Sequence, residues 1–265
     1  MRQPIGIEIV LGVLTNSLGD LGNVSLADLG CGPGIYSFPL ARRLKQVLGI
    51  DISHGQISQA NSRLAGEGPT SLSFKQGDIR ELAGLKDGQF DAVLISLVLH
   101  HLEESPGDRI GHQMALGEAF RILGSPGVLI LGVCSQPQVY DGAWYCRLMP
   151  RASEILAARH PGLEETTQLA ERFGFRPAGR FVPVDGVLQG QDYFDGLGPL
   201  RQEWRDGDSI FSLLSEDELN VLRDKIREMD REGTLTDYVR RHDEVRKSIG
   251  QVTFLTFVKS GSKEE

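Results

Sequence analysis

Short apolar runs alternate with stretches of helical spacing along most of this chain. The runs that predict strands are, in chain order, VSLADL (24–29), QVLGID (46–51), LSFKQ (72–76), FDAVLIS (90–96), VLILGVC (128–134), RFVPV (180–184) and VTFLTFV (252–258). Strands that alternate with helical segments are typical of βαβ units. The pattern therefore predicts an α/β protein built on a sheet of seven strands.

Helical spacing is clearest in two segments. Apolar residues recur at three-residue steps in IYSFPLARRL (35–44), which predicts a helix that begins near Gly34. Pro39 lies one turn inside that start, and a proline there removes a backbone hydrogen bond. A second helix is expected over 164–173, with Gly174 as its C-terminal stop.

The alternation of strand and helix breaks between 185 and 249. Ser215 followed by Glu218 is a capping-box pattern, and it predicts a helix with one apolar face formed by Leu219, Leu222, Ile226 and Met229. This region is therefore expected to be a helical insertion between the sixth and seventh strands.

Composition and charge narrow the class of protein. The chain has 265 residues, of which 40% are apolar and 24% charged, and no apolar stretch approaches the ~20 residues of a membrane helix. The N-terminus lacks a signal-peptide cleavage pattern, so a cytoplasmic protein without a membrane span is expected. Three cysteines fit neither paired disulfides nor metal ligation, and a net charge of −8 argues against a nucleic-acid partner.

The segment ADLGCGPG (27–34) is the first candidate site. Glycines at 30, 32 and 34 allow a sharp turn and a close backbone approach to a ligand, at the carboxyl end of the first predicted strand. A dinucleotide fingerprint requires a further glycine at position 35, where this chain has Ile35. Three hypotheses stay open here: a dinucleotide cradle, a cradle for another adenosine-bearing cofactor, and a simple turn.

Two aspartates follow the next predicted strands. Asp51 ends the second strand, where a carboxylate can accept hydrogen bonds from both ribose hydroxyls, in nicotinamide enzymes as in other adenosine-binding proteins. Asp78 follows the third strand in QGDIREL. It is a candidate ligand for an adenine amino group or, alternatively, the N-cap of a short helix.

Four segments together resemble class I S-adenosylmethionine-dependent methyltransferases of the small-molecule type, similar to the ubiquinone/menaquinone-biosynthesis-like enzymes. They are, in order, D-x-G-x-G-x-G (28–34), FDAVLISLVLHHLEE (90–104), EAFRILGSPGVLILGV (118–133) and TQLAERFGFRPAGRFVPV (167–184). The usual K-P-G-G turn of the third motif is replaced by Ser-Pro-Gly. The resemblance covers roughly 20–185 and 250–260.

The resemblance implies a fold, a cofactor and its binding residues. The fold is a Rossmann-like sheet of order 3-2-1-4-5-7-6, with strand seven antiparallel and helices on both faces. Residues 1–265 would form one methyltransferase domain, with 186–249 as a helical substrate lid. S-adenosylmethionine would contact Asp28, Gly30, Cys31, Gly32, Gly34, Asp51, Ile52, Asp78, Ile79, Ser96 and His101. Gly30 and Gly32 are expected at the closest approach, and no metal is expected.

The sequence specifies the residues that would contact the methyl acceptor less closely than those that would bind the cofactor. His100 is a candidate general base facing the acceptor, although a structural role competes and the reaction need not use a base, whereas His101 is expected to pack structurally. Aromatic residues suit an apolar or aromatic small-molecule acceptor, or equally the packing of the insertion. The first set is Tyr140, Trp144 and Tyr145. A second wall of the acceptor pocket is expected from Asp192, Tyr193, Phe194, Trp204 and Phe211. His160 is expected in a solvent-facing loop.

Two other functions stay open at this point. A nicotinamide-dependent reductase is disfavoured by Ile35 and by the Asp78 motif. A repurposed methyltransferase fold without methyl transfer would keep the glycine loop. The oligomeric state and the methylated atom, whether O, N or C, are not specified by these patterns.

Overall fold

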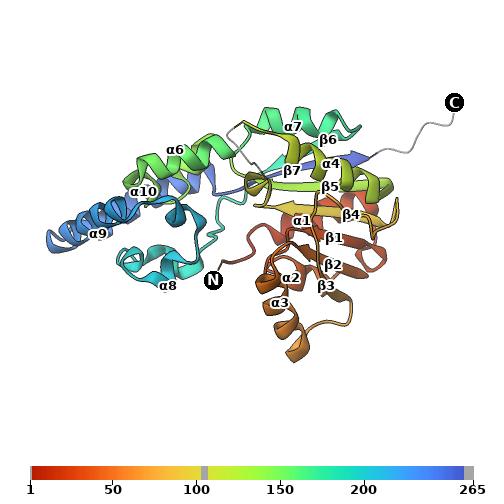
Figure 1. Ribbon diagram of the computed structural model, residues 1–265, viewed down its shortest axis with the longest axis horizontal. Coiled ribbons are helices and arrows are strands. Elements are labelled where there is room, and N and C mark those ends of the chain that lie inside the picture. The colour runs from red at the N-terminus through yellow and green to blue at the C-terminus, as the bar shows by residue number, and fades with distance from the viewer. Residues whose placement is uncertain (1, 103–106, 260–265) are drawn as a thin grey trace. The chain divides into compact units, whose positions relative to one another are not determined.

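The computed structural model describes residues 2–102 and 107–259, and the chain divides into two compact units (Figure 1). The larger unit contains the sheet and is formed by the described parts of 6–133, 162–181 and 253–259. The smaller unit is helical and is assembled from 2–5, 134–161 and 182–252. The chain therefore passes between the units several times, and the smaller unit is more than a single insertion.

Seven strands form one sheet within the described residues. They are β1 (Ser25–Leu29), β2 (Gln46–Asp51), β3 (Leu72–Gln76), β4 (Phe90–Ser96), β5 (Leu123–Val133), β6 (Arg176–Phe181) and β7 (Thr253–Lys259). Their order is β3-β2-β1-β4-β5-β7-β6, and β7 runs antiparallel to β5 and β6 while the other pairs are parallel. The predicted strand order and the antiparallel seventh strand are confirmed.

Helices cover both faces of this sheet. In the larger unit they are α1 (Ile7–Leu18), α2 (Ser37–Ala41), α3 (His54–Glu67), α4 (Ile110–Ile122) and α7 (Leu163–Glu171), with short 3-10 turns at Leu21–Asn23 and Leu99–His101. No helix in the described part of the chain is long and apolar enough to cross a membrane.

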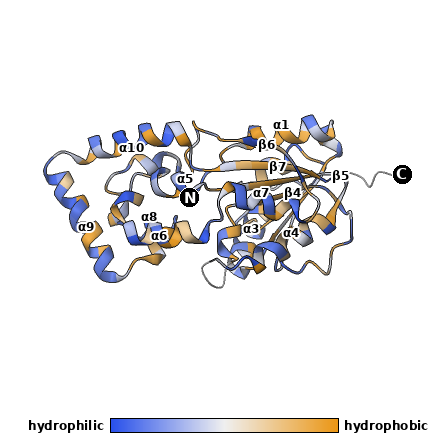
Figure 2. Cartoon of the chain, turned by 90° about the horizontal axis from the view of Figure 1, so that it is seen from above, coloured by the Kyte–Doolittle hydropathy of each residue, from blue (hydrophilic) through white to orange (hydrophobic). Residues whose placement is uncertain are grey.

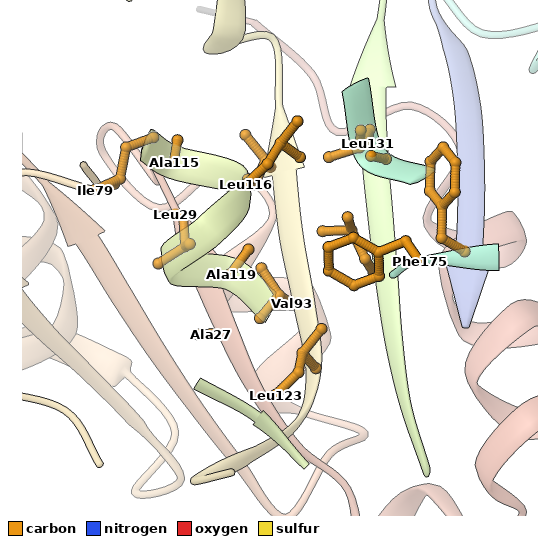
Figure 3. Packing of buried hydrophobic residues seen from close by; sticks show 14 of the residues in the cluster. Ala27, Leu29, Ile79, Val93, Ala115, Leu116, Ala119, Leu123, Leu131 and Phe175 are labelled. Carbon is orange, nitrogen blue, oxygen red and sulfur yellow. The ribbon is translucent and has the colours of Figure 1, made fainter. Parts of the chain in front are cut away.

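One hydrophobic core of the larger unit lies on the face of the sheet covered by α4 and α7. Because side chains alternate along a strand, Leu29 and Val93 share this face. Figure 3 shows Ala115, Leu116 and Ala119 of α4 packed toward them. The small side chains of Ala115 and Ala119 let α4 approach the strands closely.

Helix α2 is shorter than the sequence predicted. It begins at Ser37 and not near Gly34, and it ends at Ala41. Pro39 therefore falls in the first turn, where a backbone N–H would have no partner inside the helix. The proline sets the late start, and the loop before α2 is correspondingly longer. The predicted helix over 164–173 is confirmed as α7 within two residues, and Gly174 follows it with φ of +92°.

The sixth strand lies earlier than predicted. We expected it over 180–184, but β6 spans Arg176–Phe181 and pairs with β7. It is an edge strand whose side chains are mostly exposed, so it carries no apolar alternation to mark it. The apolar Val182 and Val184, which suggested the strand, belong to the smaller unit.

The smaller unit has its own core. Its elements are α5 (Gln136–Asp141), α6 (Pro150–Arg159), α8 (Gln202–Arg205), α9 (Glu216–Arg231) and α10 (Leu235–Ile249), with 3-10 turns at Cys146–Leu148, Gly190–Phe194, Gly198–Leu200 and Ser209–Leu213. The predicted capping box of Ser215 and Glu218 begins α9, and Leu222 and Ile226 are buried. Figure 2 shows hydrophilic and hydrophobic residues interleaved along α9 and α10. Both helices are amphipathic and pack one side into this core.

A histidine of α4 is buried without hydrogen-bond partners. His112 of α4 is fully buried, and neither of its ring nitrogens has a hydrogen-bond partner among the described residues. Burial, together with the nearby positive charge of Arg109, lowers the pKa of His112 to about 4. The imidazole is therefore neutral in the native state at neutral pH, and its N–H is buried at a cost to stability.

This pKa predicts an acid-dependent loss of stability. The folded-state pKa lies below the unfolded value of about 6.5, so the unfolded chain takes up a proton that the folded chain cannot accept as pH falls below that value. Replacing His112 by leucine should reduce the drop in unfolding free energy between pH 7 and pH 5 by roughly 1 to 2 kcal/mol. Urea unfolding at both pH values measures the difference. His54→Leu, at an exposed position of α3, is the control, and equal pH dependence of all three proteins would contradict the assignment.

Candidate functional site

The glycine loop follows β1 and is hydrogen-bonded to the carboxyl end of β2. The backbone N–H groups of Gly30 and Cys31 both donate to the carbonyl oxygen of Ile50, at 2.7 and 3.0 Å. The three glycines all have positive φ, +76° at Gly30, +55° at Gly32 and +83° at Gly34. Such a conformation strains any residue with a Cβ, which is why this turn needs glycine at these positions.

Asp51 fixes the loop from the end of β2. One carboxylate oxygen accepts the Gly32 N–H at 2.8 Å, and the other accepts the Ser53 N–H, also at 2.8 Å. Ser53 in turn is the N-cap of α3. A carboxylate that accepts backbone N–H groups is a charge-assisted partner, so Asp51 holds the loop and the start of α3 in one arrangement. Its predicted position at the end of the second strand is confirmed.

The three glycines serve different purposes. A Cβ on Gly30 would lie 2.3 Å from the Val98 side chain, and one on Gly34 would lie 2.7 Å from Phe74. A Cβ on Gly32 would meet no atom closer than Gln56 Oε1 at 4.0 Å. Of these three, only Gly32 faces open space. At Gly30 the absent Cβ makes room for Val98, and the expected close approach of the Gly30 backbone to a cofactor stays a prediction.

Asp28 and Cys31 lie inside the fold. The Asp28 carboxylate is 2% exposed and accepts a hydrogen bond from the Ser37 hydroxyl at 2.5 Å, which ties β1 to α2. Burial raises the pKa of Asp28 to about 7, against the opposing effect of the Ser37 hydrogen bond. Burial also raises the pKa of the Cys31 thiol far above its usual range. Both residues therefore support the loop from within, and Cys31 has no nucleophilic thiolate.

The Asp78 segment differs from the expectation. Asp78 forms an ion pair with Arg80 at 2.7 Å and accepts the Arg80 backbone N–H at 2.9 Å. The hydrogen bonds from the Arg80 side chain lower the pKa of Asp78. The chain continues as a turn, so the alternative of a helix N-cap is wrong. Ile79 is buried in the core of the larger unit, and it does not offer its side chain as an exposed surface.

The ends of β2 and β4 each present one unusual side chain. Ile52 is 62% exposed immediately after Asp51. At the end of β4, the Ser96 hydroxyl is buried and has no hydrogen-bond partner among the described residues. Ile52 therefore has exposed apolar surface, and Ser96 has a hydroxyl without a hydrogen-bond partner among the described residues.

The two histidines lie on the short turn after β4, with ring centroids 3.9 Å apart. His100 is buried and His101 is exposed. His101 is exposed with its ring against that of His100, and its expected structural role stays a prediction. Glu103 and Glu104, the last residues of the predicted motif, lie outside the described residues.

Trp144 and Tyr145 are core residues of the smaller unit. Both are completely buried; the Trp144 indole N–H donates to the Tyr193 carbonyl at 2.8 Å, and the Tyr145 hydroxyl donates to Asp208 at 2.6 Å. Their predicted role in stacking on an acceptor is therefore replaced by a structural one. Of the three predicted residues, Tyr140 alone is half-buried, with the Arg147 guanidinium 5.6 Å from its ring centre.

The residues predicted to form a second wall of the acceptor pocket also differ in their burial. Tyr193 and Phe211 are buried in the core around Trp144, whereas Phe194 is 47% exposed. His160, expected in a solvent-facing loop, is only 6% exposed at the end of α6. Sequence reasoning could not separate these cases, because the same aromatic residue types build cores and pockets.

Comparisons with known proteins agree on a family. The family described as "Methyltransferase domain" matches residues 27–131. An uncharacterized methyltransferase of Mycobacterium tuberculosis is 28% identical over 145 residues, which cover 55% of this chain and 68% of the relative. A demethylmenaquinone methyltransferase of Lactococcus lactis is 28% identical over 184 residues, 63% of this chain and 69% of the relative.

A solved structure extends the likeness to nearly the whole chain. The crystal structure of a putative methyltransferase from an antibiotic biosynthesis pathway of Anabaena variabilis superposes with a TM-score of 0.72. The two chains are 22% identical, and the match covers 97% of this chain and 98% of that one. At this identity the comparison shows a shared fold.

The different surroundings of Gly30 and Gly32 predict different stabilities for matched variants. Gly30→Ala combines left-handed strain with a clash against Val98 and should lower the unfolding free energy by about 3 kcal/mol. Gly32→Ala adds only the strain and should cost about 1 kcal/mol. Urea unfolding compares them. Equal losses in the two proteins would mean that the space beside Gly32 is not open.

Proposed function

Because this chain belongs to the class I S-adenosylmethionine-dependent methyltransferases, we propose that the glycine loop holds S-adenosylmethionine for methyl transfer to a small, apolar or aromatic metabolite. The observation that carries this proposal is the open space at Gly32, whose N–H is fixed by Asp51 while its missing Cβ leaves room for a ligand. Relatives named demethylmenaquinone methyltransferase and ubiquinone biosynthesis O-methyltransferase support the acceptor class.

The residues around the loop fit this cofactor. Asp51 uses one hydrogen bond on each carboxylate oxygen, and each oxygen keeps a lone pair for a ribose hydroxyl. Ile52 offers an exposed apolar surface beside the ribose position. Asp78 would reach an adenine amino group only by sharing its carboxylate with Arg80. We therefore assign the main binding contribution to Asp51 and Gly32.

The main contribution of this chain to methyl transfer would be to align the methyl donor with the acceptor. When bound, S-adenosylmethionine supplies an electrophilic methyl group on a sulfonium, and transfer to a nucleophile disperses that charge. Holding donor and acceptor in line and excluding water can account for most of such a rate. His100 is the proposed base for acceptors that must lose a proton, and His101 is the exposed alternative on the same turn.

We propose that the smaller unit serves the acceptor, with 186–249 as a lid that becomes ordered on binding. Its separate core supports this role, because a unit with its own packing can change its dynamics without disturbing the sheet. Half-buried or exposed aromatics, Tyr140 and Phe194, replace Trp144 and Tyr145 as the proposed contacts.

Loss of the Asp51 carboxylate should weaken cofactor binding without unfolding the protein. Asp51→Ala removes charge-assisted hydrogen bonds worth roughly 1.5 to 3 kcal/mol, or about tenfold to a hundredfold in affinity for S-adenosylmethionine. Isothermal titration calorimetry measures the change. Asp91→Asn is a matched control, because Asp91 accepts the Ser25 N–H at 2.8 Å at the opposite end of the strands. An Asp51→Ala protein with the parent's affinity would overturn the assignment.

The lid proposal predicts slower hydrogen exchange in the smaller unit. Peptides from 186–249 should take up less deuterium when S-adenosylhomocysteine is present, because ligand binding favours the ordered state. Peptides from the amino ends of β1 and β4 serve as the internal control. Identical exchange with and without the ligand would make the insertion purely structural.

A further inference from the structure

The smaller unit contains a cavity of about 370 Å³ along one face of α10. One wall is formed by successive turns of α10 from Leu235 to Lys247, and the loop of residues 194–197 provides a second. Asp230 of α9, which a short turn at 232–234 joins to α10 (Figure 1), also lines it. Small-molecule sites commonly have volumes of about 300 to 1,000 Å³, so the cavity is large enough for a ligand.

The cavity offers apolar surface on a fixed wall. Leu235 and Val239 belong to the core of the smaller unit and are each 5% exposed, whereas Phe194 and Leu197 are 47% and 38% exposed. A Cβ on Gly196 would lie 2.8 Å from Leu235, so glycine lets the loop lie directly against α10. Two large apolar side chains are therefore held beside the cavity with part of their surface free.

Asp230 differs from the other charged residues of the cavity. Each of the others is part of an ion pair within the described residues, such as Asp195 with Arg201 and Glu244 with Lys247. Asp230 is exposed, and in the described part of the chain its carboxylate has neither an ion pair nor a hydrogen bond. One negative charge beside the cavity is thus left without a partner.

The position of Asp230 makes this charge costly. It is the second-to-last residue of α9, and the partial negative charge at a helix C-terminus disfavours a carboxylate there. The next residue, Arg231, does not line the cavity. Residues that break a local rule in this way are expected where function requires them. The unpaired carboxylate and the helix end together favour a cation in the cavity.

We propose that this cavity binds a small organic cation with an apolar body and one ammonium group. The apolar body contacts Phe194 and Leu197, and the ammonium group pairs with Asp230. A ligand of the same shape with a carboxylate is repelled by Asp230. The proposal involves neither the glycine loop nor its cofactor, so it does not rest on the proposed function.

The test compares two probes that differ in one group: tryptamine, with an ammonium group, and tryptophol, with a hydroxyl in its place. Calorimetric titrations use the full chain without S-adenosylmethionine. Tryptamine should bind about threefold to fivefold more tightly than tryptophol, the size expected for a solvent-exposed ion pair. This preference should be largely lost at about 1 M salt, because exposed charges are then screened.

Two variants separate the charged contact from the apolar one. Asp230→Asn should abolish the preference for tryptamine without changing the affinity for tryptophol. It should unfold at a urea concentration at least as high as the parent's, because an unfavourable charge leaves the helix end. Phe194→Ala should weaken both probes by the same factor, about fivefold, and keep the preference.

Asp217→Asn provides the matched control. Asp217 is exposed in the first turn of α9 and does not line the cavity, so this variant loses the same charge and should keep both affinities. The proposal would be overturned by equal affinities of the parent for the two probes, by no tryptamine binding up to about 5 mM, or by a preference that survives Asp230→Asn. Any of these results would leave the proposed function intact, because the titrations contain no cofactor.

Discussion

The hydrogen bonds that Asp51 accepts from Gly32 and Ser53 determine the geometry on which the site depends. They join a loop that follows β1 to a helix that follows β2, across two parallel strands whose carboxyl ends lie side by side. Without this carboxylate, the N–H of Gly32 would lack its partner and the open face of the loop would lose its orientation. The carboxylate that we propose as the ribose ligand thus also shapes the glycine loop.

The other glycines show how the sheet allows this arrangement. Gly30 lets Val98 of the β4 end reach the loop, and Gly34 lets Phe74 of β3 pack beneath it. Gly30 therefore admits a side chain that follows β4 and Gly34 admits one from β3, so the loop after β1 packs against both segments. One motif supplies two packing positions and one open position, which explains why a motif match alone does not say which glycine faces a ligand.

Much of the fold could be predicted from the sequence, because the central strands are buried on both faces and appear as continuous apolar runs. The edge strand β6 could not, since its exposed side chains carry no such signal. In the site, the positions of Asp51 and the glycines follow from local spacing. The partners Ser37 of Asp28 and Arg80 of Asp78 were missed, because hydrogen-bond choice depends on side-chain directions that spacing does not fix.

The smaller unit was harder to predict for a physical reason. Its core unites Trp144 with Tyr193 and Tyr238, which lie far apart in sequence, and periodicity reports only on neighbours along a helix or strand. An aromatic cluster in one short segment looks the same whether it stacks on a ligand or fills a core. The deciding fact is the satisfied indole N–H of Trp144, bonded to the Tyr193 carbonyl. A tryptophan whose polar atom is already paired inside the protein is committed to packing, so acceptor selection must rest on side chains with free surface.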